Sequence, residues 1–364
     1  MSFYSAAVRP LLFQFDAERM HHASIATAAR MGWARGLLSA LYGFADPSLE
    51  TEVCGLTFAN PLGLAAGYDK SGEAVRALAG LGFGHVEIGS VSADPSAGNP
   101  KPRLFRLPAD RALVVHYGLQ NDGADIIAKR VAAADLAVPL GVNIVKTNRG
   151  AGACPDGEDA IIGDYLRSVR LFKDDADYLT LNLSCPNTEM GRDFFADKPH
   201  VERFLAALGE VGIPCPVFLK VSPKSGIPGI EMLLEAAEGH DFVSGFVFNL
   251  PAGKPDNLVT PREVWESWPG AVSGHPVESL INFSIREMYR RMDTRRYRIV
   301  GVGGVFTAEQ AYEKIRLGAS LVQLLTALVY EGPGVVGRIN RGLCGLLARD
   351  GFKTIAEAVG TAHT

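Results

Sequence analysis

Tyr178-Leu179-Thr180-Leu181-Asn182-Leu183-Ser184 runs directly into Cys185-Pro186-Asn187, and this stretch indicates the fold of the chain. Its first four residues, Tyr178 to Leu181, form a mostly apolar run, which is typical of a parallel strand that is buried on both faces. Its second part is polar and contains a proline, which lacks the N–H that a strand would donate. The stretch therefore predicts a buried strand that ends in a loop of chemically useful side chains.

Seven further runs of the chain have the same β-rich, apolar character. They are residues 62–67, 85–91, 140–145, 217–221, 245–249, 299–302 and 321–326. Amphipathic helical patterns alternate with them. Examples are residues 71–81, 124–134, 159–172, 229–238, 281–291 and 308–317. Eight strand–helix repeats predict an α/β protein with a (β/α)8 TIM barrel, which we place at residues 46–364.

A doubly wound sheet is the competing architecture for such an alternation. Its first strand is typically followed by the glycine-rich turn GxGxxG. The corresponding residues here are Leu64-Ala65-Ala66-Gly67, which do not fit that pattern. The barrel is therefore the favoured fold.

Two segments lie outside the repeats. Residues 95–108 carry four prolines with Lys101, Arg103 and Arg106, and we expect a hairpin excursion above the barrel. Residues 1–45 read as two short helices with apolar faces, and four arginines against two acidic residues leave this segment at +2. Such a helical hairpin can dock at a membrane surface. The alternative is that it packs on the outside of the barrel.

The bulk properties exclude several classes of protein. A net charge of −4 gives no electrostatic reason to expect nucleic-acid binding. The five cysteines are widely spaced and the eight histidines form no ligand pattern, so we expect a reducing compartment and no metal. No run reaches the about 18 apolar residues of a spanning helix, and no cleaved signal peptide is evident. We expect a cytoplasmic protein, peripheral at the inner face of the membrane if the N-terminal segment docks there.

Barrel active sites form at the carboxyl ends of the strands. The residues at these ends are 67–70, Ser90, Asn143 with Lys146, 182–187, Lys220, Asn249, Gly303, Gly304 and Thr326. They are rich in amides and lysines but poor in carboxylates and histidines. Hydrolysis by paired carboxylates and a serine hydrolase triad are therefore both disfavoured.

The last two strands lead into Gly301-Val302-Gly303-Gly304 and Leu325-Thr326-Ala327. Glycines in such a loop bare backbone N–H groups, and a helix N-terminus adds partial positive charge. This is where barrels commonly bind phosphate, although a simple tight turn would use the same glycines. A phosphate site without a metal suggests a phosphorylated organic cofactor.

Two lysines and one cysteine are the reactive candidates. Lys220 lies inside an apolar strand, so it must meet an anion, form a Schiff base or lose its charge. Lys70 can bind a substrate carboxylate, or it can be a solvated lysine at the start of a helix. Cys185 can take a proton or attack carbon, but most free cysteines are simply small buried hydrophobes.

Together these motifs resemble the dihydroorotate dehydrogenase family, and specifically its membrane-associated, quinone-using branch. The likeness extends from about Phe13 to Pro333 and is carried by several runs in order. They are residues 12–19 (LFQFDAER), 60–67 (NPLGLAAG), 82–90 (GFGHVEIGS), 101–107 (KPRLFRL), 299–304 (IVGVGG) and 318–323 (GASLVQ). The N-terminal helical extension marks the quinone-using branch.

The resemblance implies a role for each matching position. The ring of flavin mononucleotide (FMN) would rest near Ala65, Ala66, Gly67, Ser90, Asn143, Asn182 and Lys220. Its phosphate would be held by Gly274, Gly303, Gly304 and Thr326. The substrate would be bound by Lys70, Gln120, Asn182, Asn187 and Asn249. Cys185 would remove the C5 proton of dihydroorotate while C6 delivers hydride to the flavin, which a quinone then reoxidises.

Several positions depart from the pattern of that branch. Cys185 stands where serine is usual, and Gln120 where the family has a substrate-binding asparagine. Asn249-Leu250-Pro251 replaces Thr-Asn-Thr, His116 and Leu325 replace an arginine and a tyrosine of the quinone tunnel, and Ala327 replaces a glycine. A second hypothesis is therefore the same flavin chemistry on another small ring, and a third is a lysine-dependent lyase or a non-catalytic relative.

Overall fold

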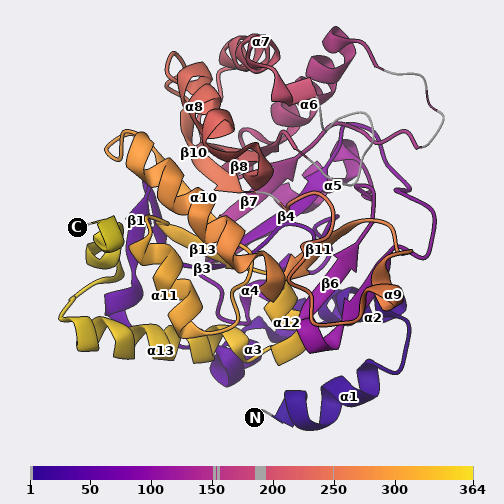
Figure 1. The fold of residues 1–364 in the computed structure, drawn as a ribbon, viewed down its shortest axis with the longest axis vertical. Helices are drawn as coiled ribbons and strands as arrows, with labels where there is room; N and C mark the ends of the chain where they lie inside the picture. Colours follow the sequence, from indigo (N-terminus) through magenta and orange to yellow (C-terminus); the bar gives the residue numbers. More distant parts are fainter. Residues whose placement is uncertain (1–2, 151–152, 154–155, 185–193, 249, 364) are drawn as a thin grey trace.

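The computed structural model describes residues 3–150, 153, 156–184, 194–248 and 250–363. Its centre is a closed barrel of eight parallel strands, which confirms the predicted TIM barrel (Figure 1). The strands are β3 (Leu62–Leu64), β4 (His85–Val91), β7 (Leu140–Ile144), β8 (Tyr178–Asn182), β9 (Val217–Val221), β10 (Val243–Phe248), β12 (Arg298–Val302) and β13 (Leu321–Leu324). Most of their residues are buried, as expected for strands that are covered on both sides.

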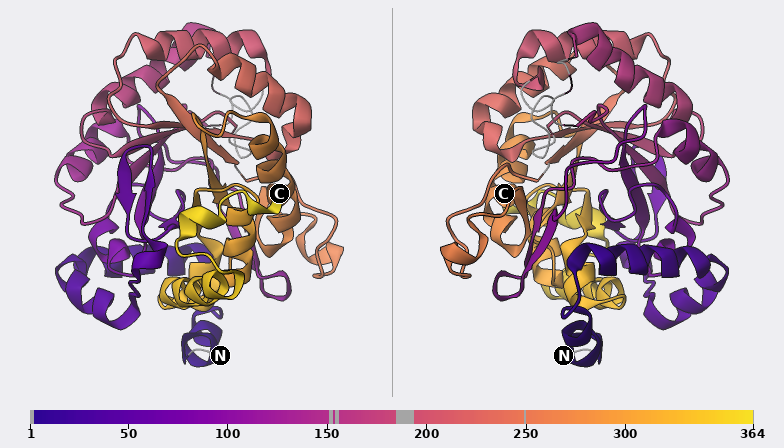
Figure 2. Two further views of the ribbon diagram at one scale, coloured as in Figure 1. Left: turned by 90° about the vertical axis from the view of Figure 1, so that its left-hand side faces the viewer. Right: turned by 90° about the vertical axis from the view of Figure 1, so that its right-hand side faces the viewer.

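Helices cover the outside of the barrel (Figures 1 and 2). They are α4 (Val75–Ala79), α5 (Ala124–Ala132), α6 (Glu158–Phe172), α7 (Lys198–Gly209), α8 (Gly226–Ala237), α10 (Glu278–Arg291), α11 (Ala308–Arg316), α12 (Thr326–Glu331) and α13 (Val335–Asp350). The start of α11 is fixed by a capping box between Thr307 and Gln310. The predicted strand 321–326 is too long, because Thr326 already begins helix α12.

A short hairpin closes the amino-terminal end of the barrel. It pairs β1 (Thr51–Val53) with β2 (Leu56–Phe58). The turn residues Cys54 and Gly55 have φ values of 52° and 78°, the positive values that a tight two-residue hairpin turn requires. Side chains of the hairpin pack against inward-facing residues of five barrel strands. The cluster consists of Val53, Phe58, Tyr178, Phe218, Val247, Val300 and Leu321.

A second, antiparallel sheet lies beside the barrel. It consists of β5 (Leu104–Leu107), β6 (Ala112–Val115) and β11 (Ala271–Gly274), with β6 in the middle. The expected hairpin at 95–108 is therefore only part of a larger element. Its third strand comes from a loop that also carries the short helix α9 (Arg262–Trp265).

The N-terminal extension contains three helices rather than the expected two. A π-helical turn (Tyr4–Val8) leads into α1 (Arg9–Leu12), and α2 (Ala17–Arg30) precedes α3 (Arg35–Tyr42). Figure 2 shows the N-terminus and α1 at the edge of the molecule. Helix α2 instead packs against β5 and α4, and it buries Ala17, Glu18 and Ile25. Across the described residues, no helix combines the length and the apolar character needed to cross a membrane.

Candidate active site

A cavity of about 300 Å³ lies at the carboxyl ends of the barrel strands, between the barrel, the antiparallel sheet of β5, β6 and β11, and helix α2. It brings together most of the residues that the sequence nominated. These are Ala65, Ala66, Gly67, Lys70, Ser90, Gln120, Asn182, Lys220, Gly274, Gly303, Gly304 and Thr326. Residues from six different strand ends thus meet around one space, as in other barrel sites.

Of the residues nominated for the cofactor and the substrate, Asn143 is described but does not line this cavity. Cys185, Asn187 and Asn249 lie outside the described residues, so their roles stay predictions. Asn143 is fully buried behind the wall, where its Oδ1 accepts a 2.6 Å hydrogen bond from Ser90 Oγ. Asn143 therefore acts on the cavity through Ser90 rather than directly.

One part of the wall consists of backbone in conformations that favour glycine. Gly274, Gly303 and Gly304 have φ values of 101°, 100° and 75°. A Cβ atom on Gly304 would lie 2.5 Å from the Cβ of Glu278, and one on Gly274 would lie 2.4 Å from the carbonyl oxygen of Arg111. These positions thus keep a space that a side chain would disturb. The hydroxyl groups of Ser273 and Thr326, 3.1 Å apart, lie in the same wall.

The charge of the wall suits an anionic ligand. Among the described residues, the wall includes Lys70, Arg106 and Lys220 but no carboxylate. Lys220 is only 5% exposed and lies within strand β9, so its charge is held in a largely dry environment. The glycine turns, the hydroxyl groups and these cations together fit the phosphate and the ring edge of a flavin nucleotide.

Lys70 is not a solvated lysine at the start of a helix. Its Nζ lies 3.1 Å from Nε2 of His21, a residue of helix α2, and 3.9 Å from the ring centroid of Tyr117. Burial lowers the pKa of Lys70 to about 8. The pKa of His21 is lowered mainly by burial and to a smaller extent by the charge of Lys70. The His21 ring is therefore neutral, and its Nε2 accepts a hydrogen bond from Lys70.

Gln120 is held by an arginine that the sequence did not nominate. Arg103 is 3% exposed and donates from Nη2 to Gln120 Oε1 at 2.5 Å. The same guanidinium group donates from Nε and Nη2 to Glu18 Oε1, at 3.1 and 2.9 Å. The amide oxygen of Gln120 is thus engaged, which leaves its NH₂ group for the cavity. Glu18 and Arg103 both lie in the motifs that matched the family, so pairing opposite charges between those motifs could have found them.

The far end of the cavity is apolar and lies against the N-terminal extension. Its wall there consists of Tyr4, Leu12, Phe13, Met20, Leu104, Val115, Phe306, Leu325, Leu328 and Val329. Arg106 lies over the ring of Phe13, with 4.5 Å between its Cζ and the ring centroid, and donates to the carbonyl oxygen of Phe15 at 2.7 Å. Leu325 lines this region as expected. His116 does not, because its ring turns toward Asn99, with Nε2 3.1 Å from the Asn99 Nδ2.

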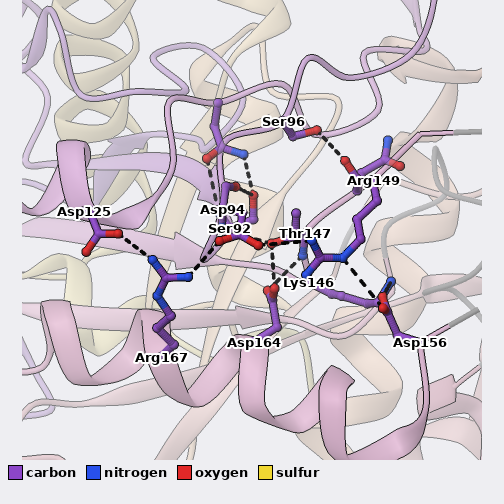
Figure 3. Close-up of polar contacts among 12 residues, drawn as sticks. Ser92, Asp94, Ser96, Asp125, Lys146, Thr147, Arg149, Asp156, Asp164 and Arg167 are labelled. Carbon is purple, nitrogen blue, oxygen red and sulfur yellow. Dashed lines mark hydrogen bonds and ion pairs between the residues drawn. The ribbon is translucent and has the colours of Figure 1, made fainter. Parts of the chain in front are cut away.

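Ion pairs fasten the loops on the side of the site near α5 and α6 (Figure 3). Arg149 contacts Asp94 at 3.1 Å, and Arg167 of α6 contacts Asp94 at 2.7 Å and Asp125 of α5 at 2.5 Å. Lys146, expected among the strand-end residues, is paired with Asp156 at 2.7 Å and does not line the cavity. Each exposed pair is worth little alone, but the network ties the loops after β4 and β7 together.

The comparison with known sequences decides the family. Residues 48–347 match the dihydroorotate dehydrogenase family. This chain belongs to the dihydroorotate dehydrogenase family. The protein of Natronomonas pharaonis named dihydroorotate dehydrogenase (quinone) is 40% identical over 365 residues, and the alignment covers 97% of each chain. The protein of the same name from Anaeromyxobacter dehalogenans is 40% identical over 361 residues, covering 98% of this chain and 96% of its own length.

A solved structure agrees with this assignment. DHODH of Eimeria tenella, in complex with ferulenol, superposes with a TM-score of 0.83 at 29% identity, and the match covers 96% of each chain. The expected family and its quinone-using branch are therefore confirmed, and the chain is a flavin-dependent oxidoreductase acting on a CH–CH bond.

Proposed function

We propose that this dihydroorotate dehydrogenase family member oxidises dihydroorotate to orotate, with FMN as its flavin and a quinone as the electron acceptor. The observation that supports the proposal best is the cavity, where two lysines and several amides meet glycine turns suited to phosphate. The names of the relatives support both the substrate and the acceptor.

In this proposal the residues of the cavity divide between the two ends of the flavin. Gly274, Gly303, Gly304 and Thr326 hold its phosphate. The residues around its ring are Ala65, Ala66, Gly67, Ser90, Asn182 and Lys220. When bound, the flavin accepts the hydride from the substrate ring. Lys220 keeps a positive charge at the ring edge, which favours the reduced form.

The substrate is bound by charge and by amides. Lys70 pairs with its carboxylate, while Gln120, Asn182, Asn187 and Asn249 supply hydrogen bonds to its ring. Cys185 takes the C5 proton, and since a thiol has a reference pKa of ~8.5 it needs little activation near neutral pH. The lysine and the amides thus hold the substrate ring in one orientation, with its C5 proton next to the thiolate that removes it.

A different small ring as the substrate is the second candidate, and Gln120 favours it. Its amide oxygen is held by Arg103, so it offers the cavity a donor from a longer side chain than the family's asparagine. An error of ~1 Å at the reacting centre is enough to alter which ring is accepted.

One anaerobic experiment tests the proposal. The purified protein, loaded with FMN, is mixed with dihydroorotate while the visible absorbance of the flavin is followed. We expect rapid bleaching, and recovery of the absorbance when a quinone is added. An oxidised flavin that also shows no spectral change with orotate would exclude dihydroorotate and favour another ring.

We also propose that the N-terminal extension docks on a membrane, where quinones dissolve. Six large apolar side chains of the extension are exposed, three of them by more than 60%. They are Phe3, Leu11, Phe15, Trp33, Leu37 and Leu41. Leu37 and Leu41 lie four residues apart on α3 and so share one side of this helix, and Trp33 lies in the 3₁₀ turn Gly32–Ala34 directly before it. The apolar end of the cavity borders the same extension, which would let a quinone enter from the bilayer.

A further inference from the structure

A carboxylate lies inside the barrel beneath the cavity. Glu87 of strand β4 has no solvent exposure. Its Oε1 accepts from Asn143 Nδ2 at 2.9 Å, and its Oε2 accepts from Gln323 Nε2 at 2.9 Å. The hydroxyl groups of Thr180 and Tyr178 donate to Oε2 at 3.1 and 3.3 Å. All four of these partners are arranged as donors, which satisfies the buried group through hydrogen bonds.

The first branch from Glu87 runs to the wall of the cavity through Asn143. Both oxygens of Glu87 accept hydrogen bonds, and Asn143 turns its NH₂ group toward Oε1. The carbonyl oxygen of Asn143 then faces Ser90 and accepts from its Oγ at 2.6 Å. Because the Ser90 hydroxyl donates its only hydrogen to Asn143, its oxygen acts as the acceptor toward Asn182 Nδ2, at 3.2 Å. Ser90 and Asn182 both line the cavity. Glu87 therefore determines which of their groups donate and which accept.

The second branch runs through Gln323, which lines the cavity directly. The NH₂ group of Gln323 faces two acceptors, Glu87 Oε2 at 2.9 Å and His85 Nε2 at 3.5 Å. Burial lowers the pKa of His85 to about 3, so its ring is neutral. The carbonyl oxygen of Gln323 is left buried with no hydrogen-bond partner among the described residues. A buried acceptor of this kind is costly unless something donates to it.

We propose that Glu87 is a positioning residue of the cavity, which fixes the donor and acceptor sense of Asn143, Ser90, Asn182 and Gln323. In this arrangement Ser90 and Asn182 present one fixed hydrogen-bonding sense to the ring that occupies the cavity. The inference rests on the proposed function, because it takes that ring to be the flavin. Glu87 itself touches neither the ring nor the substrate and acts through the two branches.

The test replaces the carboxylate by its neutral isostere. In Glu87→Gln an NH₂ group would face the NH₂ group of Asn143 or of Gln323, so one of these amides must turn over. We expect the FMN dissociation constant, measured by titrating the apoprotein, to rise about tenfold or more. We also expect the visible absorption bands of the bound flavin to shift. The matched control is Tyr178→Phe, which removes one donor from the same carboxylate but leaves both amides in place, so its FMN affinity and spectrum should match the wild type.

The double variant Glu87→Gln/Gln323→Glu separates the branches. The new amide at position 87 can then donate to the new carboxylate at position 323, while the amide oxygen still accepts from Asn143. The branch to Ser90 should therefore recover, but the negative charge now lies in the cavity wall. We expect an FMN affinity between those of the wild type and Glu87→Gln. This variant also serves as the test if Glu87→Gln does not fold, and in that case a dissociation constant and spectrum equal to the wild type overturn the inference.

The failures of the two proposals are distinguishable. Wild-type protein that neither binds FMN nor is bleached by dihydroorotate would overturn the proposed function. Wild-type protein that binds FMN, together with a folded Glu87→Gln variant of unchanged affinity and unchanged spectrum, would overturn only the role of Glu87.

Discussion

Lys70 Nζ and His21 Nε2 lie 3.1 Å apart, so a lysine of the barrel and a histidine of the N-terminal extension meet in the wall of one cavity. The contact is possible because burial and the nearby positive charge keep His21 neutral. It leaves Lys70 with hydrogens free for a second acceptor, since an ammonium group carries three. The pKa of Lys70, about 8, then becomes a measurable property of the site.

The affinity for anionic ligands should fall at high pH. Burial lowers the pKa of Lys70, so its charge is present below about pH 8 and is lost above it. Orotate binding, followed by the flavin difference spectrum, should weaken up to about tenfold for each pH unit beyond that point. In Lys70→Arg the guanidinium group stays charged, so the loss should disappear even if the affinity differs. The same pH dependence in both proteins would show that another group is responsible.

Replacing the proposed base should slow one step and spare the cofactor. Cys185→Ala should keep its flavin but reduce it with dihydroorotate about 10²–10⁴-fold more slowly, the usual contribution of a general base. Stopped-flow absorbance measures this directly. Cys215→Ala is the matched control and should reduce its flavin at the wild-type rate. Cys215 precedes β9 at the amino-terminal end of the barrel, and burial raises its pKa to about 11. Equal rates for Cys185→Ala and wild type would remove Cys185 from the mechanism.

Removing the amide of Gln120 should affect substrate binding more than turnover. In Gln120→Leu the Nη2 group of Arg103 loses one acceptor, and the cavity loses a donor. We expect KM to rise about tenfold, a smaller change in kcat, and a loss of roughly 1–3 kcal/mol in the free energy of unfolding. His22→Ala is the control, because His22 contacts Glu18 from the solvent side and does not reach Gln120. A kcat effect larger than the KM effect would place Gln120 in the chemical step instead.

The membrane proposal predicts a separation of the two half-reactions. Trp33→Ser/Leu37→Ser/Leu41→Ser should lose co-sedimentation with liposomes and turn over membrane-embedded quinone more slowly. Reduction of its flavin by dihydroorotate should be unchanged, since these side chains face solvent. Val259→Ser removes a comparably exposed apolar side chain that is not part of the extension and should change neither property. Liposome binding that survives the triple substitution would leave the extension with only a packing role.

Substituting these side chains is a better test than deleting residues 1–45, because the deletion would do more than remove a membrane anchor. Helix α2 supplies Glu18 to Arg103 and His21 to Lys70, and it buries Ile25 in the main core. A truncated chain would therefore open the cavity and leave a buried guanidinium group with less compensation.

The sequence was sufficient for the barrel, and most of the residues that it nominated line the cavity. The strands were recognisable because burial on both faces makes them apolar throughout, as in Val217–Val221. The expectation of two helices in residues 1–45 was one helix short, because the buried residues of α2 are few and include the charged Glu18. The pairing of β6 with β11 depends on contacts between residues about 160 positions apart in the chain, which no local pattern contains. Glu87 was hidden for a similar reason, because a single acid in an apolar strand does not reveal which side chains will surround it.

The shared wall between α2 and the barrel has a thermodynamic consequence. Binding sites that share structural elements are linked, and linkage is reciprocal. If a molecule that occupies the apolar end of the cavity shifts α2 and changes the contact of His21 with Lys70, it must alter orotate affinity by some factor. Orotate must then alter the affinity of that molecule by the same factor. Ligands designed for one end of this enzyme should therefore be measured with the other end both empty and filled.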